Sequence, residues 1–182
     1  MSEFETFAVV LSFILGLGVA QILSSVVYLL QARREVRIAW TPLLWAYALL
    51  LYHVNFLFAL LQAINEALWH LDLLMAALLF LAGGLVLPTA GRPLPDDLID
   101  FFEEHGRIAL LPFALFQGLN ILYYALSGWP LFGPDGVLNI VLLLLLVPGF
   151  WGRGAVKFVT SLVFAGLVTV AFLFLWARPG AI

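Results

Sequence analysis

The chain has 182 residues, of which 64% are hydrophobic and only 10% are charged, and its net charge at pH 7 is −3. A soluble domain carries about 25% charged residues, so this chain cannot cover a water-facing surface and must place much of its apolar area in lipid. The negative charge argues against nucleic acid as a partner, and the absence of cysteine excludes disulfides and thiolate metal sites. We therefore expect an all-α polytopic integral membrane protein whose main partner is the lipid bilayer.

Six apolar stretches approach the length of about 20 residues that a helix needs to cross the hydrocarbon core. The pattern predicts one transmembrane domain, a six-helix bundle. The expected spans are residues 6–30, 41–64, 71–87, 108–126, 137–149 and 155–176. The first stretch is interpreted as a retained span, since no basic residues precede it and no small-residue cleavage site follows it.

A short amphipathic helix is expected over residues 96–105, between the third and fourth spans. Its acidic residues are separated from Leu98, Ile99, Phe101 and Phe102, a pattern typical of a helix at the membrane interface. Asp97 provides a helix N-cap and Gly106 a stop. The acidic face either contacts water or binds a basic partner or a divalent ion.

The basic residues predict the topology. Seven of the eight lie in three alternate gaps between the spans: Arg33, Arg34, Arg37, Arg92, Arg107, Arg153 and Lys157. Because Lys and Arg near span ends are retained on the cytoplasmic face, both termini are expected to be non-cytoplasmic in the cell (inner) membrane. Tryptophans mark the expected span ends: Trp40 and Trp151 inside, Trp69, Trp129 and Trp176 outside, with Trp45 one turn in.

Uncharged polar side chains share one face in each of three spans. These candidate substrate-binding or pore-lining residues are Gln21 and Ser25 in the first span, Tyr52, Asn55 and Gln62 in the second, and Gln117, Asn120 and Tyr124 in the fourth. Four of them are amides near mid-span, where an unpaired amide facing lipid would cost several kcal/mol. We expect them to point inward, either as hydrogen-bonding links between helices or as the lining of a polar site.

His53 is the only ionisable residue near the middle of a span, and its helical angle places it roughly opposite Asn55. It is interpreted either as a pH-sensitive functional group or as a neutral histidine bonded to an adjacent helix. A b-type haem would need a second histidine at matching depth, which the chain does not offer. No cofactor, metal site or catalytic residue is expected.

Three function classes remain open. The first is a small transporter or channel that passes a small polar solute or ion through a midplane seam between the first, second and fourth spans. The second is a structural or assembly subunit, in which Gly16, Ala20 and Ser24 form a small-residue ridge for a homo-oligomer or a membrane-protein partner. The third is an integral membrane enzyme using His53, or His105 with Glu104, although no nucleophile accompanies them.

Overall fold

The computed structural model describes residues 3–62, 69–90, 94–128, 130 and 132–176. Its regular elements are α1 (Glu3–Gln31), α2 (Trp40–Gln62), α3 (Trp69–Leu85), α4 (Leu98–Glu104), the 3-10 helix η1 (Gly106–Ala109), α5 (Leu110–Leu126), α6 (Pro134–Trp151), α7 (Ala155–Ala171) and the π-helix η2 (Phe172–Trp176). Among these residues the only strand-like feature is an isolated bridge between Arg37 and Asp97. The expected all-α fold is therefore confirmed.

Five helical segments are long and apolar enough to cross a membrane. They are Thr6–Gln31, Trp40–Phe58, Gly106–Leu126, Pro134–Trp151 and Ala155–Phe174. α3 is equally apolar but has only 17 residues, which corresponds to about 25 Å of helix. The fifth expected span proves longer than predicted, because Pro134 opens α6 where no backbone N–H is needed and the helix continues past Pro148 to Trp151.

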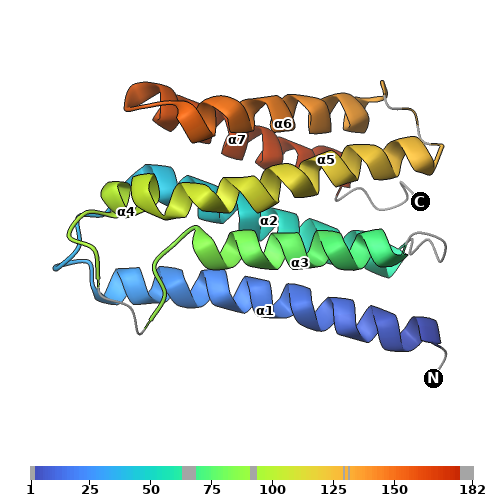
Figure 1. Cartoon of the computed structure of the whole chain (residues 1–182), viewed down its shortest axis with the longest axis horizontal. Helices are drawn as coiled ribbons and strands as arrows, with labels where there is room; N and C mark the ends of the chain where they lie inside the picture. The colour runs from blue at the N-terminus through green and yellow to red at the C-terminus, as the bar shows by residue number, and fades with distance from the viewer. Residues whose placement is uncertain (1–2, 63–68, 91–93, 129, 131, 177–182) are drawn as a thin grey trace.

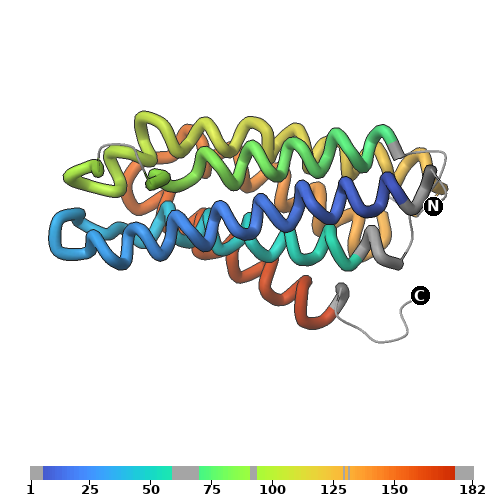
Figure 2. The backbone as a smooth tube through the Cα atoms, turned by 90° about the horizontal axis from the view of Figure 1, so that it is seen from below, coloured from blue at the N-terminus to red at the C-terminus, as the bar shows by residue number. Residues whose placement is uncertain are grey.

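Five helices form a closed ring, and the sixth long helix lies outside it. α2, α3, α5, α6 and α7 each pack on the next, and α7 returns to α2, whereas α1 packs on α2 and α3 (Figures 1 and 2). Successive long helices run in opposite directions, so α1 begins and α7 ends toward the same end of the bundle (Figure 1).

Aromatic side chains fill the interior of the ring. Trp45 contacts Phe164 with ring centroids 4.7 Å apart, Phe164 lies 5.7 Å from Phe113, and Phe113 lies 5.0 Å from Tyr52. All four are at most 1% exposed. Trp45 thus belongs to the core and not to the interfacial tryptophans with which the sequence grouped it. Gly149 permits this position, because a Cβ there would lie 2.7 Å from the Trp45 ring.

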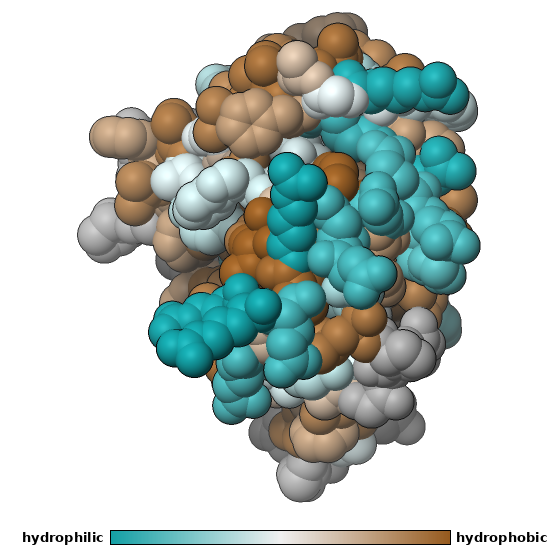
Figure 3. Space-filling model, turned by 90° about the vertical axis from the view of Figure 1, so that its left-hand side faces the viewer, coloured by the Kyte–Doolittle hydropathy of each residue, from teal (hydrophilic) through white to brown (hydrophobic). Residues whose placement is uncertain are grey.

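The basic residues gather at one end of the bundle. The α1–α2 loop, η1 and the α6–α7 connection carry exposed arginines at positions 33, 34, 37, 107 and 153. Figure 3 shows hydrophilic side chains concentrated on this end face. Trp40 and Trp151 are 70% and 71% exposed near it. The sequence therefore grouped these arginines correctly in space; Arg92 lies outside the described residues.

The helix expected over residues 96–105 is present as α4, residues 98–104. Asp97 caps it, with its Oδ1 accepting a hydrogen bond from the Ile99 amide at 2.8 Å. Leu98 and Phe102 are completely buried. The sequence predicts a helix whose apolar side chains face the membrane interface. Leu98 and Phe102 instead pack inside the protein and do not contact lipid.

Candidate functional site

The interior of the ring contains one polar pair at mid-depth. Near the middle of α5, the Gln117 Nε2 donates a hydrogen bond to the Tyr52 hydroxyl of α2 at 2.8 Å. Gln117 is completely buried and Tyr52 is 1% exposed. Phe113 and Phe116 meet the Tyr52 ring edge-on, with centroids 5.0 and 5.6 Å away. The structure therefore brings together two of the predicted site residues and encloses them in aromatic rings.

Gln117 has hydrogen-bonding capacity left over. Its Nε2 donates to Tyr52, while its buried Oε1 has no hydrogen-bond partner among the residues that the structure describes. A buried amide oxygen without a partner carries a desolvation cost of about 1–3 kcal/mol. In native proteins such an atom generally binds an ordered water or a ligand. This carbonyl is therefore a point in the interior of the helix ring where a hydrogen-bond donor would be stabilised; the buried Trp45 Nε1 of the same core also lacks a partner among the described residues.

Asn120 forms a second contact, one turn further along α5. Its Nδ2 lies 3.4 Å from the Oδ1 of Asn139 on α6, and the Asn139 Nδ2 donates to the Asp135 carbonyl at 3.0 Å. Asn139 is 3% exposed. The sequence placed Asn139 near the end of a short span and left it out of the candidate site. This pair links α5 to α6.

Gln21 and Ser25 lie elsewhere, on the helix outside the ring. Ser25 is buried and Gln21 is half-buried. Gln21 packs on α3, where a Cβ added to Gly84 would lie 2.7 Å from the Gln21 Nε2. Since α1 packs on α2 and α3, Gln21 and Gln117 occupy different helix contacts. The structure does not gather the amides of the first, second and fourth spans at one point.

The remaining candidates contribute less to a defined site. Asn55 and Tyr124 are half-buried on α2 and α5. The side chain of Gln62 lies outside the described residues. Among the residues that the structure describes, no group of three or more His, Asp or Glu lies close enough to hold a metal ion.

His53 is wedged between three helices. It is completely buried, and its Nδ1 lies 2.8 Å from the Leu49 carbonyl of its own helix. A carbonyl only accepts, so Nδ1 carries a proton, and in the neutral imidazole Nε2 is then a bare acceptor; it has no partner among the described residues. Gly18 of α1 and Gly83 of α3 lie against the ring. The expected bond to an adjacent helix is thus replaced by one to the preceding turn, and pH sensitivity stays a prediction.

A buried ion pair was missed entirely by the sequence analysis. The Lys157 Nζ of α7 lies 2.6 Å from the Glu103 Oε1 of α4 and 5.7 Å from the Phe102 ring centroid. Lys157 is 1% exposed. The sequence assigned both residues to a wet membrane surface, and no local pattern connects positions 54 residues apart.

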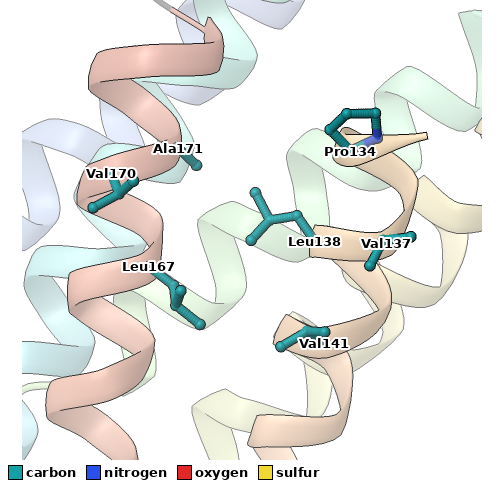
Figure 4. A pocket seen from close by; sticks show the side chains of 7 residues that line it. All are labelled: Pro134, Val137, Leu138, Val141, Leu167, Val170 and Ala171. Carbon is teal, nitrogen blue, oxygen red and sulfur yellow. The ribbon is translucent and has the colours of Figure 1, made fainter. Parts of the chain in front are cut away.

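An apolar groove lies on the side of the ring between α6 and α7 (Figure 4). Its volume is about 310 Å³. The lining residues are Pro134, Val137, Leu138, Val141, Leu167, Val170 and Ala171. Such a lining suits an acyl chain better than a polar solute, and none of the candidate site residues contributes to it.

Comparisons of the chain with protein-family models, with curated proteins and with solved structures gave no match. A function therefore has to be inferred from the residues of this chain.

The Tyr52–Gln117 hydrogen bond should contribute measurably to stability. We expect a double-mutant cycle of Tyr52→Phe and Gln117→Leu to give a coupling energy of about 0.6 kcal/mol, the mean for interhelical hydrogen bonds in membranes, and at most about 1.7 kcal/mol. Unfolding in mixed detergent micelles, followed by tryptophan fluorescence, measures it. As a control, Tyr47→Phe removes an exposed hydroxyl of the same helix and should be additive with Gln117→Leu. Additivity in both cycles would show that the bond contributes nothing.

Proposed function

We propose that this chain is a six-span membrane protein that passes a small polar solute across the bilayer by way of Gln117 and Tyr52. In this proposal α3 is the sixth span, covered in part by α1, α2 and α5, with Leu74, Leu81 and Leu85 exposed on its remaining face. The basic end is cytoplasmic and both termini are outside, in the cell's inner membrane. The observation that carries the proposal is the Gln117 Oε1, a mid-depth acceptor that is buried and has no partner in the described part of the chain.

The chemistry of this atom narrows the solute. A carbonyl oxygen accepts hydrogen bonds, so it favours a molecule with N–H or O–H groups and disfavours an anion. The surrounding rings of Phe113 and Phe116 supply no charge to balance a bare cation. We therefore infer a neutral hydrogen-bond donor such as water or a urea-like molecule. For a solute to pass, the Phe113 and Phe116 side chains must change rotamer, because they enclose the Tyr52–Gln117 pair in this conformation.

Solute flux in reconstituted vesicles tests the proposal. Urea, which donates hydrogen bonds, should enter protein-containing liposomes faster than empty ones, and trimethylamine N-oxide, which only accepts them, should not. Gln117→Leu should lower the urea rate about tenfold, because a hydrogen bond of about 1.4 kcal/mol corresponds to that factor.

The control variant for this assay is Ser24→Ala, which changes a polar residue on the exposed face of α1. It should leave the urea rate unchanged. Flux equal to that of empty liposomes for water and for a panel of neutral donors would contradict the proposal. A Gln117→Leu rate equal to that of the unmodified protein would also contradict it.

A role as an assembly subunit is the second candidate, favoured by the outer face of α1. Gly16, Ala20 and Ser24 are all exposed, and a Cβ added to Gly16 would meet nothing within 4 Å. A ridge of small residues lets another helix approach closely, and this ridge has no partner helix among the described residues. If gentle extraction recovers the protein together with a constant partner protein, and Gly16→Ile abolishes that association, this function would be favoured.

A further inference from the structure

Helix α4 is fastened to the basic end of the bundle at both of its ends. Before it, the Arg37 amide donates to the Asp96 carbonyl at 2.9 Å, and the Leu98 amide donates to the Arg37 carbonyl at 3.1 Å. Near its last turn, Glu103 pairs with Lys157 at 2.6 Å. Between these points α4 packs on α2 and η1, with the Leu98 and Phe102 side chains buried.

The environment of Lys157 makes its charge dependent on the ion pair with Glu103. Lys157 lies in the first turn of α7, where the helix dipole disfavours a cation. Its side chain is 2% exposed, whereas that of Glu103 is 37% exposed. Burial of an unpaired charge is strongly unfavourable. The Glu103 carboxylate and the Phe102 ring, which both lie next to the Lys157 ammonium group, belong to α4. Without Glu103, movement of α4 away from α7 would therefore let water reach Lys157.

The connection that follows α4 has the form of a hinge. The α-helical hydrogen-bonding pattern stops at His105, whose φ of −120° and ψ of −49° depart from helical values. The 3-10 turn η1 then leads into α5. Short 3-10 segments are common connectors between helices, and this one interrupts the α-helical hydrogen bonding between α4 and α5. A rotation of α4 about residues 105–109 would therefore leave the hydrogen bonds within α5 intact.

We propose that α4 is a closing segment at the basic end of the bundle and that the Glu103–Lys157 pair is its latch. Opening separates α4 from α7, hydrates Lys157 and exposes the buried faces of Leu98 and Phe102. The proposal concerns α4 alone and does not depend on solute transport. If the bundle does conduct, this movement would control access to it from the basic end.

The absence of cysteine allows a direct test with single introduced thiols. Leu98→Cys places a thiol on the buried face of α4, and Leu79→Cys places one in the buried part of α3, as a reporter of the whole bundle. The rate of maleimide labelling is measured for the full-length protein in lipid nanodiscs, with each of the latch variants described next.

If the Glu103–Lys157 pair is a latch, substitution of its two residues should raise the labelling rate at position 98 by unequal amounts. Glu103→Gln leaves a buried ammonium group without a counter-charge and should raise the labelling rate at position 98 at least about tenfold. Lys157→Met leaves a carboxylate that water can reach, so the rate should rise only about two- to fivefold. The double variant removes both charges and should return the rate toward that of the unmodified latch.

Two controls separate opening of α4 from other changes. Arg37→Gln removes the exposed Arg37–Asp97 pair at 3.7 Å and should leave the rate at position 98 unchanged. The Leu79→Cys rate should stay constant in every variant. The proposal is overturned if the single variants label at the unmodified rate, if the double variant labels faster than Glu103→Gln, or if position 79 becomes reactive in parallel. Should Glu103→Gln not fold, Lys157→Met is the deciding variant: labelling at position 98 at the unmodified rate, or a parallel rise at position 79, overturns the proposal.

Discussion

Gly18→Ala is expected to destabilise the bundle by about 1–3 kcal/mol, the usual cost of adding atoms to a packed interior. A Cβ at position 18 would lie 2.3 Å from the His53 Nε2 and 2.6 Å from its Cδ2. The imidazole cannot easily retreat, because it is bonded to the Leu49 carbonyl and lies against Gly83 on its other side. The new methyl group would therefore push α1 away from α2 and α3.

Gly16→Ala is the matched control for this substitution. Both glycines lie in α1 two residues apart, but a Cβ at position 16 would meet nothing within 4 Å. Since alanine is favoured over glycine inside a helix by up to about 1 kcal/mol, this variant should be neutral or slightly stabilising. Thermal unfolding in detergent, followed by tryptophan fluorescence, compares the two variants. An equal effect of both would show that α1 does not pack on His53.

Phe113→Ala should have the largest effect of any single substitution considered, a loss of about 3–5 kcal/mol. Phe113 is completely buried and joins two parts of the aromatic core, with its ring 5.0 Å from Tyr52 and 5.7 Å from Phe164. Truncation would leave a cavity at the centre of the helix bundle. It would also remove one of the aromatic side chains that enclose the Tyr52–Gln117 pair. The same unfolding assay measures it.

Leu115→Ala controls for the loss of apolar volume from α5. Leu115 is 54% exposed on the outer face of the helix, so lipid can fill the space that its side chain leaves. We expect a change of less than about 1 kcal/mol. Comparable losses in both variants would mean that the ring interior is not packed as described.

The helices could be predicted because hydrophobic length is a local property of the sequence. Each of the six expected stretches coincides with a helix to within a few residues, and the main difference is the extension of α6 to residues 134–151. The clustering of arginines at one end also follows from local spacing, since alternate connections of antiparallel helices lie at the same end. The side of the membrane on which they lie is not determined by the fold.

The site could be predicted only in part, because helical angles give directions and not neighbours. Gln117 and Tyr52 meet as their inward faces suggested. Gln21 was assigned to the same seam, but α1 lies outside the ring of helices. The spacing of polar residues along a helix does not show whether that helix belongs to the ring. Trp45 was grouped with the interfacial tryptophans because it lies near a span end. Position along the span does not show whether the indole ring faces lipid or packs against Gly149 of another helix.

The Glu103–Lys157 pair shows a further limit of sequence reasoning. Charges near span ends are normally solvated, and this assumption placed both residues in water. Only the folded structure shows that Glu103 of α4 meets Lys157 of α7 and that the ammonium group is buried. Likewise, Asp72 lies near a span end, and its side chain is buried in the first turn of α3.

The most direct test of the proposed solute site is a high-resolution density map of the protein in lipid, with urea present. We expect density for water or urea at about 2.7–3.2 Å from the Gln117 Oε1, with Nε2 still bonded to the Tyr52 hydroxyl. An Oε1 that contacts only side-chain carbons, or that accepts a hydrogen bond from another residue of the chain, would contradict the account.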